Sequence, residues 1–559
     1  MQDCKTARLQ NCKTARLHDL HDLHDLHDLH NPMTMYIKTG KPEFDNLIPL
    51  IKGFFEKDIL DVVIDGKKIR GYRSPDACSI WLRDYSDMIR AFRYFEKDLL
   101  STIIHFADTQ SANGRIFDYF TTYPEKLPCE KENWTKYVRV PVEADVEYRF
   151  IKTAWIAWQA SGNDEFVRKL LPNFEKALAY IMNSWYWDPD KFLVKRPYTI
   201  DTWDFAYTAG KHDWLQFQID DNTFWGYMHG DNSGYFEAFT IMSNWYSFFG
   251  DDQNAKDWKL KAERIKESMN NICWNGDFYT HFVKITPVTI REVDEEYQLS
   301  LSNPMDINRG VTTSEMARSI IREYKKRKKE SGAFAEWFSI HPPFPDGIFG
   351  DDKLVAGAYC NGGIMPLAGG ELARAAFENG EEKYGIKILN QYYDLISPNG
   401  ETYLWYFPDG KHSSVETSTS PEALPTDGWG SGAMLYALIE GLAGVQDKIK
   451  EFKNIRLTPR WEAAEVKKAE VMIQYPASDA FVKYTYLSSA DFIKLEIEGS
   501  PEETDLEILL PENRKAFSVN STGAIVKSTD ETKRTDNYFR CSITNMKSHF
   551  AITINLTGK

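Results

Sequence analysis

The sequence predicts a mainly helical protein that ends in a β-rich domain. Amphipathic helical segments follow one another from about residue 44 to residue 445, and most pairs are followed by a turn and a short aromatic strand-like stretch. From about Lys453 the pattern changes to alternating strands. Because a helical hairpin cannot bury its apolar stripe alone, repeated hairpins should close into a ring with inner and outer layers. We therefore predict an (α/α)6 barrel followed by a C-terminal antiparallel β-sandwich.

The first 32 residues form a low-complexity segment. The stretch 2–9 recurs almost unchanged as 10–17, and a His-Asp-Leu repeat begins at His18. The repeat places five histidines at intervals of three residues, but a repeat this regular is typical of sequence duplication and does not build a core. We expect residues 1–32 to be disordered and assign them no metal; we expect no cofactor elsewhere in the chain.

The expected barrel domain covers residues 33–450. Its predicted helical segments are 44–55, 81–106, 142–160, 165–185, 235–249, 254–272, 313–325, 358–377, 381–395 and 433–442. The turns with aromatic stretches between them are 113–120, 188–193, 275–279, 345–349 and 399–403. Long loops on one face of such a ring would form a concave site.

The expected sandwich domain covers residues 455–559. Apolar and polar residues alternate with period two in the stretches 469–475, 480–486, 492–497, 506–510 and 549–555, with Gly, Pro and Asn between them. No cluster of catalytic residue types stands out there. The domain should pack against the barrel or present a surface to a partner.

Composition and charge exclude several classes of partner and site. The net charge of −15, without a concentrated basic surface, argues against a nucleic-acid partner. No apolar run reaches the roughly 18 residues of a membrane helix, and no secretory signal is recognisable, so we expect no membrane partner and a cytoplasmic location. Seven cysteines without CxxC spacing argue against a zinc site. Aromatic residues make up 14% of the chain, which suits sugar rings as well as core packing.

Asp204 is the candidate general acid. It lies between Trp203 and Phe205. Partial desolvation by these aromatic neighbours would raise its pKa toward the range that a proton donor needs. The alternative is a loop residue that caps the next helix, a usual role for Asp.

Trp81, Arg83 and Asp84 open an apolar helix. A guanidinium fork and a carboxylate side by side can bind vicinal hydroxyl groups, and Trp81 offers a stacking face. The alternative is an internal ion pair between Arg83 and Asp84.

Further candidate site residues lie in two stretches that are rich in aromatic and polar residues. His229 lies within the stretch 216–234, which is dense in aromatic and hydrogen-bonding residues. No second His at helical spacing supports a metal site, so we interpret His229 as part of a polar loop wall that binds substrate. Trp405 and Trp429 are candidate sugar-stacking residues of the last rich loop, and Trp203 is another. Glu416, Glu422 and Asp427 offer carboxylates that can activate water.

Four short motifs together resemble those of the six-hairpin glycosidases, the superfamily of glucoamylases, trehalases, processing α-glucosidases and α-L-rhamnosidases. The motifs are 81–84 (Trp-Leu-Arg-Asp), 202–204 (Thr-Trp-Asp), 362–366 (Gly-Gly-Ile-Met-Pro) and 428–433 (Gly-Trp-Gly-Ser-Gly-Ala). The likeness spans about residues 33–445, and the trailing domain is similar to that of the rhamnosidase group. It implies that Arg83 and Asp84 grip the sugar in the cleaved subsite and that Asp204 is the general acid.

One motif departs from the pattern. The processing α-glucosidases carry their base in a Tyr-Glu-x-Tyr-x-Pro run, and in the similar stretch 403–408 Leu404 stands at the Glu position. Either Glu416 or Glu422 acts as the base, or hydrolysis is not the reaction. We expect an inverting glycoside hydrolase with a carbohydrate substrate, Asp204 as acid and Glu416 as base. A glycoside phosphorylase and a non-catalytic sugar-binding protein remain alternatives.

Overall fold

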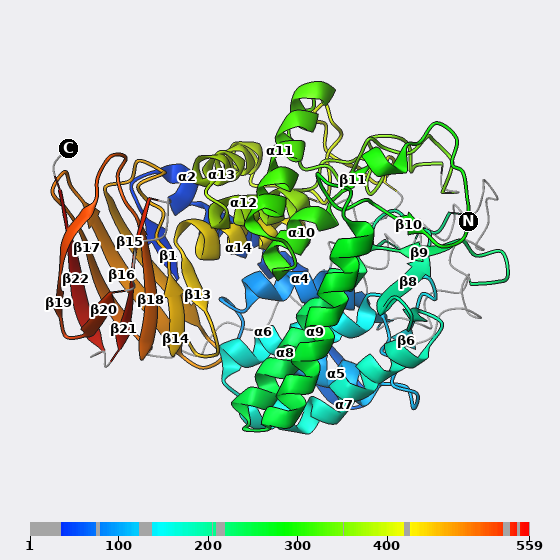
Figure 1. Ribbon diagram of the computed structural model, residues 1–559, viewed down its shortest axis with the longest axis horizontal. Helices are drawn as coiled ribbons and strands as arrows, with labels where there is room; N and C mark the ends of the chain where they lie inside the picture. Colours follow the sequence, from blue (N-terminus) through cyan, green and yellow to red (C-terminus); the bar gives the residue numbers. More distant parts are fainter. Residues whose placement is uncertain are drawn as a thin grey trace, which may run out of the picture.

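The computed structural model describes residues 35–73, 79–121, 137–203, 205–207, 219–349, 352–418, 425–528, 537–544 and 548–557. The segment 1–32, which we expected to be disordered, lies outside these residues. Helices fill one part of the molecule and two larger sheets fill the other (Figure 1). A mainly helical chain with a β-rich C-terminal part is therefore confirmed.

Helices occur in each region where the sequence predicts them. They are α2 (Pro42–Asp45), α3 (Leu47–Asp58), α4 (Leu82–Phe92), α5 (Ser101–Asp108), α6 (Val146–Ser161), α7 (Asp164–Asn183), α8 (His229–Phe248), α9 (Asp252–Cys273), α10 (Ser302–Arg309), α11 (Ser314–Ser331), α12 (Pro366–Glu378), α13 (Glu382–Ile396) and α14 (Gly428–Tyr436). A π-helical segment, Ala437–Leu442, continues α14. The helix α10 was not predicted.

Among the described residues, helices α4, α6, α8, α10, α12 and α14 contact one another in that order, and α14 returns to α4. Helices α7, α9, α11 and α13 each pack on the helix of this ring that precedes them. Burial follows the two layers: residues 366–377 of α12 are all buried, whereas α7 buries one stripe at spacings of three and four residues. A helix buried all round belongs inside, and an amphipathic one covers it.

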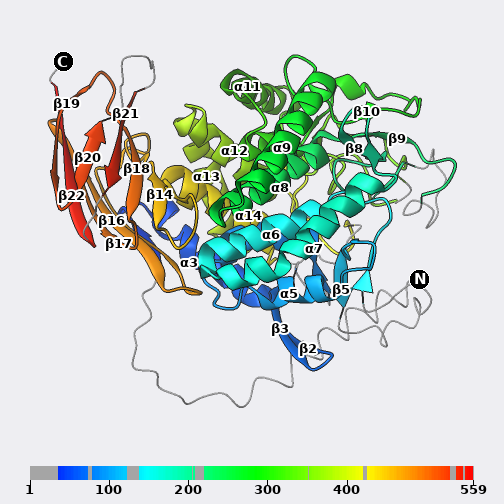
Figure 2. The ribbon, with the colours of Figure 1, turned by 60° about the horizontal axis from the view of Figure 1, so that its bottom comes forward.

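Short strands precede several ring helices. One sheet holds β4 (Ser79–Trp81), β5 (Tyr119–Thr121) and β6 (Tyr137–Val138), and a second holds β7 (Trp187–Asp188), β8 (Leu193–Pro197), β9 (Trp225–Tyr227) and β10 (Val283–Lys284). Strands β11 (Leu299–Ser300) and β12 (Ile340–His341) form a pair. The hairpin of β2 (Ile59–Ile64) and β3 (Lys67–Tyr72) projects from the helices (Figure 2). Because β4, β9 and β11 lead almost directly into α4, α8 and α10, they fix where these helices begin.

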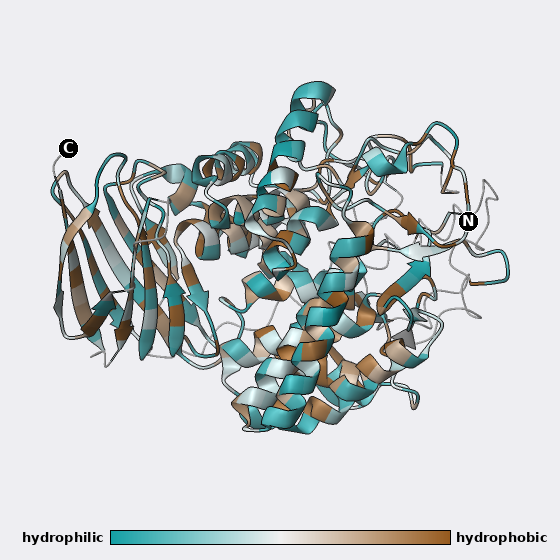
Figure 3. Ribbon diagram, in the orientation of Figure 1, coloured by the Kyte–Doolittle hydropathy of each residue, from teal (hydrophilic) through white to brown (hydrophobic). Residues whose placement is uncertain are grey.

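Two sheets make up the β-rich part. The order of the first is β1 (Tyr36–Lys38), β15 (Lys468–Tyr475), β16 (Ala480–Ser488), β17 (Phe492–Gly499), β22 (His549–Leu556) and β19 (Ala516–Thr522). The order of the second is β13 (Val445–Asp447), β14 (Asn454–Leu457), β18 (Glu503–Leu509), β21 (Tyr538–Thr544) and β20 (Ile525–Ser528). Hydrophobic and hydrophilic residues alternate along the strands (Figure 3). Strand β14 pairs parallel to β18, and β1 comes from the other end of the chain.

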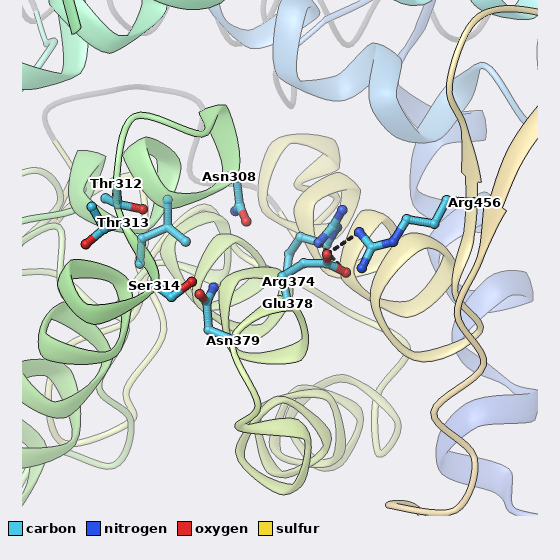
Figure 4. Close-up of a pocket in the computed structure, with 9 residues that line it drawn as sticks. Asn308, Thr312, Thr313, Ser314, Arg374, Glu378, Asn379 and Arg456 are labelled. Carbon is cyan, nitrogen blue, oxygen red and sulfur yellow. Dashed lines mark hydrogen bonds and ion pairs between the residues drawn. The ribbon is translucent and has the colours of Figure 1, made fainter. Parts of the chain in front are cut away.

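The helices and the sheets meet at Glu378, the last residue of α12. Its carboxylate pairs with Arg374 on α12 at 3.1 Å, with Arg460 at 2.7 Å and with Arg456 on β14 (Figure 4). Burial raises the pKa of this carboxyl, but the three guanidinium groups outweigh that effect and hold the pKa of Glu378 well below its ordinary value. A cavity of about 330 Å³ lies beside this junction.

Candidate active site

The beginnings of α4, α6 and α14 lie together. The guanidinium of Arg83, in the first turn of α4, donates a hydrogen bond to Asp145 at 3.1 Å and another to Glu143. Asp145 is the N-cap residue of α6. Trp429, in the first turn of α14, donates its indole N–H to Asp87 on α4 at 3.0 Å. These contacts bring the segments that enter three ring helices to one place.

The beginnings of α8 and α10 join the same end. His229, the first residue of α8, lies within hydrogen-bond distance of Asp306 on α10 and of Ser300, which is 3.1 Å away just before α10. The hydroxyl of Tyr235 on α8 donates to the carbonyl of Ala144 at 2.6 Å. The first turns of neighbouring ring helices therefore meet, and side chains at this end can act on one ligand.

Arg83 and Asp84 differ in environment although they are adjacent. Only 6% of Arg83 is exposed, and its guanidinium is engaged by the carboxylates of Glu143 and Asp145. Burial lowers the pKa of Arg83, but these carboxylates keep it well above its ordinary value, so the group is always charged. Asp84 is partly exposed, and its negative charge is close enough to raise the pKa of Asp427.

Aromatic rings line this end of the ring. Trp81, which is partly exposed, stacks on Tyr119 with centroids 3.9 Å apart. The ring of Trp203 lies 6.4 Å from that of Trp429 and 5.8 Å from that of Tyr359. Trp203 and Trp429 are only 3% and 4% exposed, so little of either ring is accessible.

The turn that precedes Asp204 is firmly held. Arg196, buried in β8, donates to the carbonyl of Trp203 at 2.7 Å and pairs with Asp231 on α8 at 3.2 Å. Asp201 accepts hydrogen bonds from the backbone N–H and the hydroxyl of Ser302 at the start of α10. Asp204 itself, the predicted acid, lies outside the described residues, and so does Glu422. These bonds fix the turn 201–203 against β8, α8 and α10.

The buried carboxyl groups fall into two classes. Asp87 and Asp145 are surrounded by arginines and Lys152, which outweigh burial and hold the pKa of both well below the ordinary value. Burial raises the pKa of Asp427 to about 7, and it raises the pKa of Asp58 and of Asp118 well above the ordinary value. The first class is ionised at neutral pH, whereas the second can hold protons there.

Asp427 caps α14. Its carboxylate accepts from the backbone N–H groups of Trp429 at 3.1 Å and Gly430 at 2.9 Å. Capping satisfies two N–H groups that the helix cannot pair itself. Asp427 therefore fixes the backbone at Trp429, and both of its carboxylate oxygens are engaged by the end of α14.

Three other predicted site residues differ from these in burial. His229 and Trp405 have no exposed surface; His229 is held by Asp306 and Ser300, and the indole N–H of Trp405 lies 3.4 Å from the hydroxyl of Ser418. Packing and hydrogen bonds account for both side chains in this structure, and their part in substrate binding stays a prediction. Glu416 is exposed to solvent, where a hydrogen bond from Ser414 lowers its pKa.

Two residues of the site were not predicted. Tyr119 backs Trp81, and it lies in the aromatic stretch 113–120 that the sequence marks as a turn. Tyr359 contacts both Trp203 and Phe205 and has a φ of 46°. A non-glycine residue in this left-handed region costs about 1–2 kcal/mol, and such strain is often found at functional sites. The glycines at 357, 362 and 363 around Tyr359 were the available signal.

The described residues hold no group of three or more His, Cys, Asp or Glu side chains arranged to bind a metal ion. None of the helices built from these residues has the length and hydropathy that crossing a bilayer requires.

Comparison with known proteins finds similarity in structure only. No protein-family model and no curated sequence matches the chain. The structure is similar to an α-L-rhamnosidase of Streptomyces avermitilis solved with L-rhamnose, with a TM-score of 0.60, 12% identity, and 94% of this chain covered against 42% of that one. It is also similar to the α-L-rhamnosidase of Dictyoglumus thermophilum, with a TM-score of 0.57 and 12% identity, and 93% of this chain is covered against 50% of that one. For the GH78 family rhamnosidase of Bacillus sp. GL1 the TM-score is 0.53 and the identity 13%, and 86% of this chain is covered against 43% of that one.

These similarities confirm the expected likeness to glycosidases at the level of the fold. The chain spans half or less of the length of each of these three rhamnosidases.

Proposed function

We propose that this protein is a glycoside hydrolase whose active site lies at the first turns of the ring helices. One observation carries the proposal: Trp81, Arg83, Asp84, Trp203 and Trp429, which come from three separate parts of the chain, converge at this end of the ring. Their chemistry, a partly exposed carboxylate held beside a fixed arginine and near aromatic rings, suits a sugar ring with its hydroxyl groups. The rhamnosidase-like fold supports the same class of substrate.

We also infer the finer architecture. A closed order of six contacting helices with further helices packed outside is the arrangement of an (α/α)6 barrel. The two C-terminal sheets, each with alternating burial, would form a β-sandwich. The domain bounds would be residues 33–450 and 455–559, with β1 added to the sandwich across its pairing with β15.

In this proposal Asp84 accepts hydrogen bonds from the sugar hydroxyls, and Arg83 acts as a positioning residue. The contacts of Arg83 with Glu143 and Asp145 tie the start of α4 to the start of α6, which fixes the backbone that carries Asp84. Trp81 stacks on the sugar with Tyr119 behind it. Trp203 and Trp429 would close the apolar side of the pocket.

Hydrolysis would proceed with inversion. Asp204 protonates the glycosidic oxygen while a second carboxylate takes a proton from the water that attacks the anomeric carbon. Inversion requires the two carboxyl groups to lie about 6.5–9.5 Å apart. Glu416 is the proposed base and Glu422 its alternative. In this structure Glu416 is exposed to solvent and its pKa is lowered, which makes it a weak base. The assignment therefore requires the loop that carries Glu416 to bring its carboxylate to the substrate.

One observation favours phosphorolysis as a second candidate. Leu404, which stands where the processing α-glucosidases carry their base, is buried with only 3% exposed. A phosphorylase needs no such base but needs cations to hold phosphate. The arginines at this end of the ring are already engaged: Arg83 by Glu143 and Asp145, and Arg196 by Asp231. We therefore favour hydrolysis.

The proposed acid is tested by Asp204→Asn. We expect the variant to lower turnover of rhamnosides and glucosides at least about a hundredfold, the usual contribution of a general acid. Substrates with very acidic leaving groups should lose less, because they depart without protonation. Rates with and without inorganic phosphate distinguish hydrolysis from phosphorolysis. An unchanged rate on an ordinary glycoside would remove Asp204 from the mechanism, and turnover that depends on phosphate would identify a phosphorylase.

The proposed base is tested by comparing Glu416→Gln with Glu422→Gln. The variant that loses the base should lose hydrolysis of activated and unactivated glycosides alike, since water must be activated whatever the leaving group. Added azide should then restore turnover, because this nucleophile needs no deprotonation. A Glu416→Gln enzyme at full rate beside an inactive Glu422→Gln enzyme would transfer the role to Glu422.

A further inference from the structure

A cavity of about 210 Å³ lies inside the ring, at the end opposite the candidate active site. Every ring helix contributes to its wall. The contributing residues include Arg90 of α4, Trp155 of α6, Glu237 of α8, Asn308 of α10, Glu371 of α12 and Tyr436 of α14. Arg90, Trp155, Asn308 and Tyr436 lie in the last two turns of their helices, whereas the candidate active site is built from first turns.

A layer of buried ion pairs separates this central cavity from the candidate active site. Lys152, which lines the cavity, donates to Asp87 at 2.7 Å. Asp87 also accepts from Arg149 at 3.0 Å and from Trp429 of the active site at 3.0 Å. The cavity is therefore a separate space, and Asp87 connects its wall to the active-site tryptophan.

The charges of the wall are balanced within the protein. Three of its cations pair with three of its anions: Arg90 with Glu371, Arg93 with Glu440 at 2.7 Å, and Arg309 with Glu237 at 3.5 Å. A wall whose charges compensate one another offers little attraction to an ion. It suits an uncharged polar molecule.

Four residues of the wall nevertheless carry a buried polar atom that makes no hydrogen bond with any described residue. The donors without a hydrogen bond are Nη2 of Arg90, which has only an ion pair with Asp87 at 3.6 Å, and Nε of Arg93. The acceptors without one are Oδ1 of Asn308 and Oε2 of Glu237, which has only its 3.5 Å ion pair with Arg309. Buried polar groups are normally satisfied, so a cluster of exceptions around one cavity indicates an occupant. Hydroxyl groups meet both needs, because each one donates and accepts.

We propose that the central cavity is a second carbohydrate site, which binds one neutral polyhydroxylated molecule such as a monosaccharide or a polyol. Its volume equals that of roughly seven waters, which gives room for one sugar ring and not for a chain of them. Trp155, which is partly exposed, supplies the apolar surface that the carbon face of such a molecule requires. The proposal rests on the cavity alone and does not require glycosidase activity.

The test measures binding of D-glucose, L-rhamnose and glycerol to the full chain by calorimetry. Asp84→Ala removes the proposed active-site contact and should leave one binding event, that of the cavity. In the Asp84→Ala background, Glu237→Gln and Asn308→Ala should each weaken this event about tenfold, because each removes one acceptor from the wall. Glu263→Gln, an exposed position on α9, makes the same chemical change as Glu237→Gln outside the cavity and should have no effect.

Thermal unfolding shows whether each variant is folded. If Glu237→Gln does not fold, the binding measured with Asn308→Ala tests the proposal. Absence of binding of all three probes by the Asp84→Ala protein would mean that the cavity holds only water and would overturn the proposal. Binding that is insensitive to both wall variants would place the site elsewhere. Binding of inorganic phosphate in competition with the sugars would replace the carbohydrate site with an anion site.

Discussion

Burial separates the roles of neighbouring side chains at the candidate active site. Arg83 faces two carboxylates of the α6 entry and is almost inaccessible, whereas Asp84 is partly exposed on the first turn of α4. An arginine already satisfied by Glu143 and Asp145 has little left to offer a ligand. The carboxylate beside it is the group that a sugar can reach.

We predict that Asp84→Ala weakens sugar binding at the active site at least about a hundredfold, because a site built to bond hydroxyl groups loses heavily when a polar partner is missing. The free energy of unfolding should change by less than about 1 kcal/mol, since the side chain is only partly buried. Calorimetry with L-rhamnose and urea unfolding measure the two effects. Asp252→Ala, an exposed residue in the first turn of α9, is the control. A large loss of stability without loss of affinity would assign Asp84 to the fold.

The proposed binding residues could be identified from motifs, but their accessibility could not. Short motifs identify Trp81, Arg83 and Asp84 because the pattern itself carries the chemistry. His229 lies in an equally polar stretch, yet its ring is buried by partners about seventy residues further along the chain, Ser300 and Asp306. Local sequence does not record such long-range contacts, which is why the burial of His229 and Trp405 could not be predicted.

Helix boundaries depend on local capping that periodicity does not show. The predicted helix 81–106 is two helices, α4 and α5, because side chains between them bond to the backbone instead. Glu96 accepts from the N–H groups of residues 97 and 98, and Asp98 accepts from those of residues 100 and 101. Such bonds compete with the helical pattern and end it. The chain can then turn after the ring helix α4 and continue into α5.

Glycines misled the prediction at the start of α8. The sequence places the helix start near Tyr235, whereas α8 begins at His229 and includes Gly230 and Gly234. At Gly234 a Cβ would lie 2.4 Å from the ring of Tyr148, and at Gly230 it would lie 2.3 Å from the hydroxyl of Ser302. These glycines allow α8 to approach α6 and α10 closely. Close packing of the ring, not a loop, explains them.

At the scale of the whole molecule, pairings across long stretches of sequence hold the parts together. Strand β1, near the start of the described chain, pairs with β15, more than four hundred residues later. Period-two alternation predicted β15 but gives no information about its partner. The junction at Glu378 is of the same kind, because its three arginines belong to α12, β14 and the segment after β14. The order of elements was predictable, whereas the contacts that join helices to sheets were not.

The junction gives a prediction about stability. Glu378→Gln should lower the free energy of unfolding by about 3 kcal/mol at pH 7, because removing one member of a buried ion network leaves the other charges uncompensated. The arginines hold the pKa of Glu378 below its value in the unfolded chain. The stabilisation is therefore complete above the unfolded pKa, about 4.3, and is lost as pH falls through the folded pKa.

Urea unfolding from pH 7 down to pH 3 should show the wild-type advantage over Glu378→Gln shrinking below about pH 4.3. Glu512→Gln, at an exposed turn between β18 and β19, is the matched control and should differ little from wild type at any pH. If the network joins the two parts, the variant should also unfold in two separate steps, helices and sheets, where the wild type unfolds in one. A deficit of equal size at pH 7 and pH 3 would mean that the charge of Glu378 is not what holds the helices to the sheets.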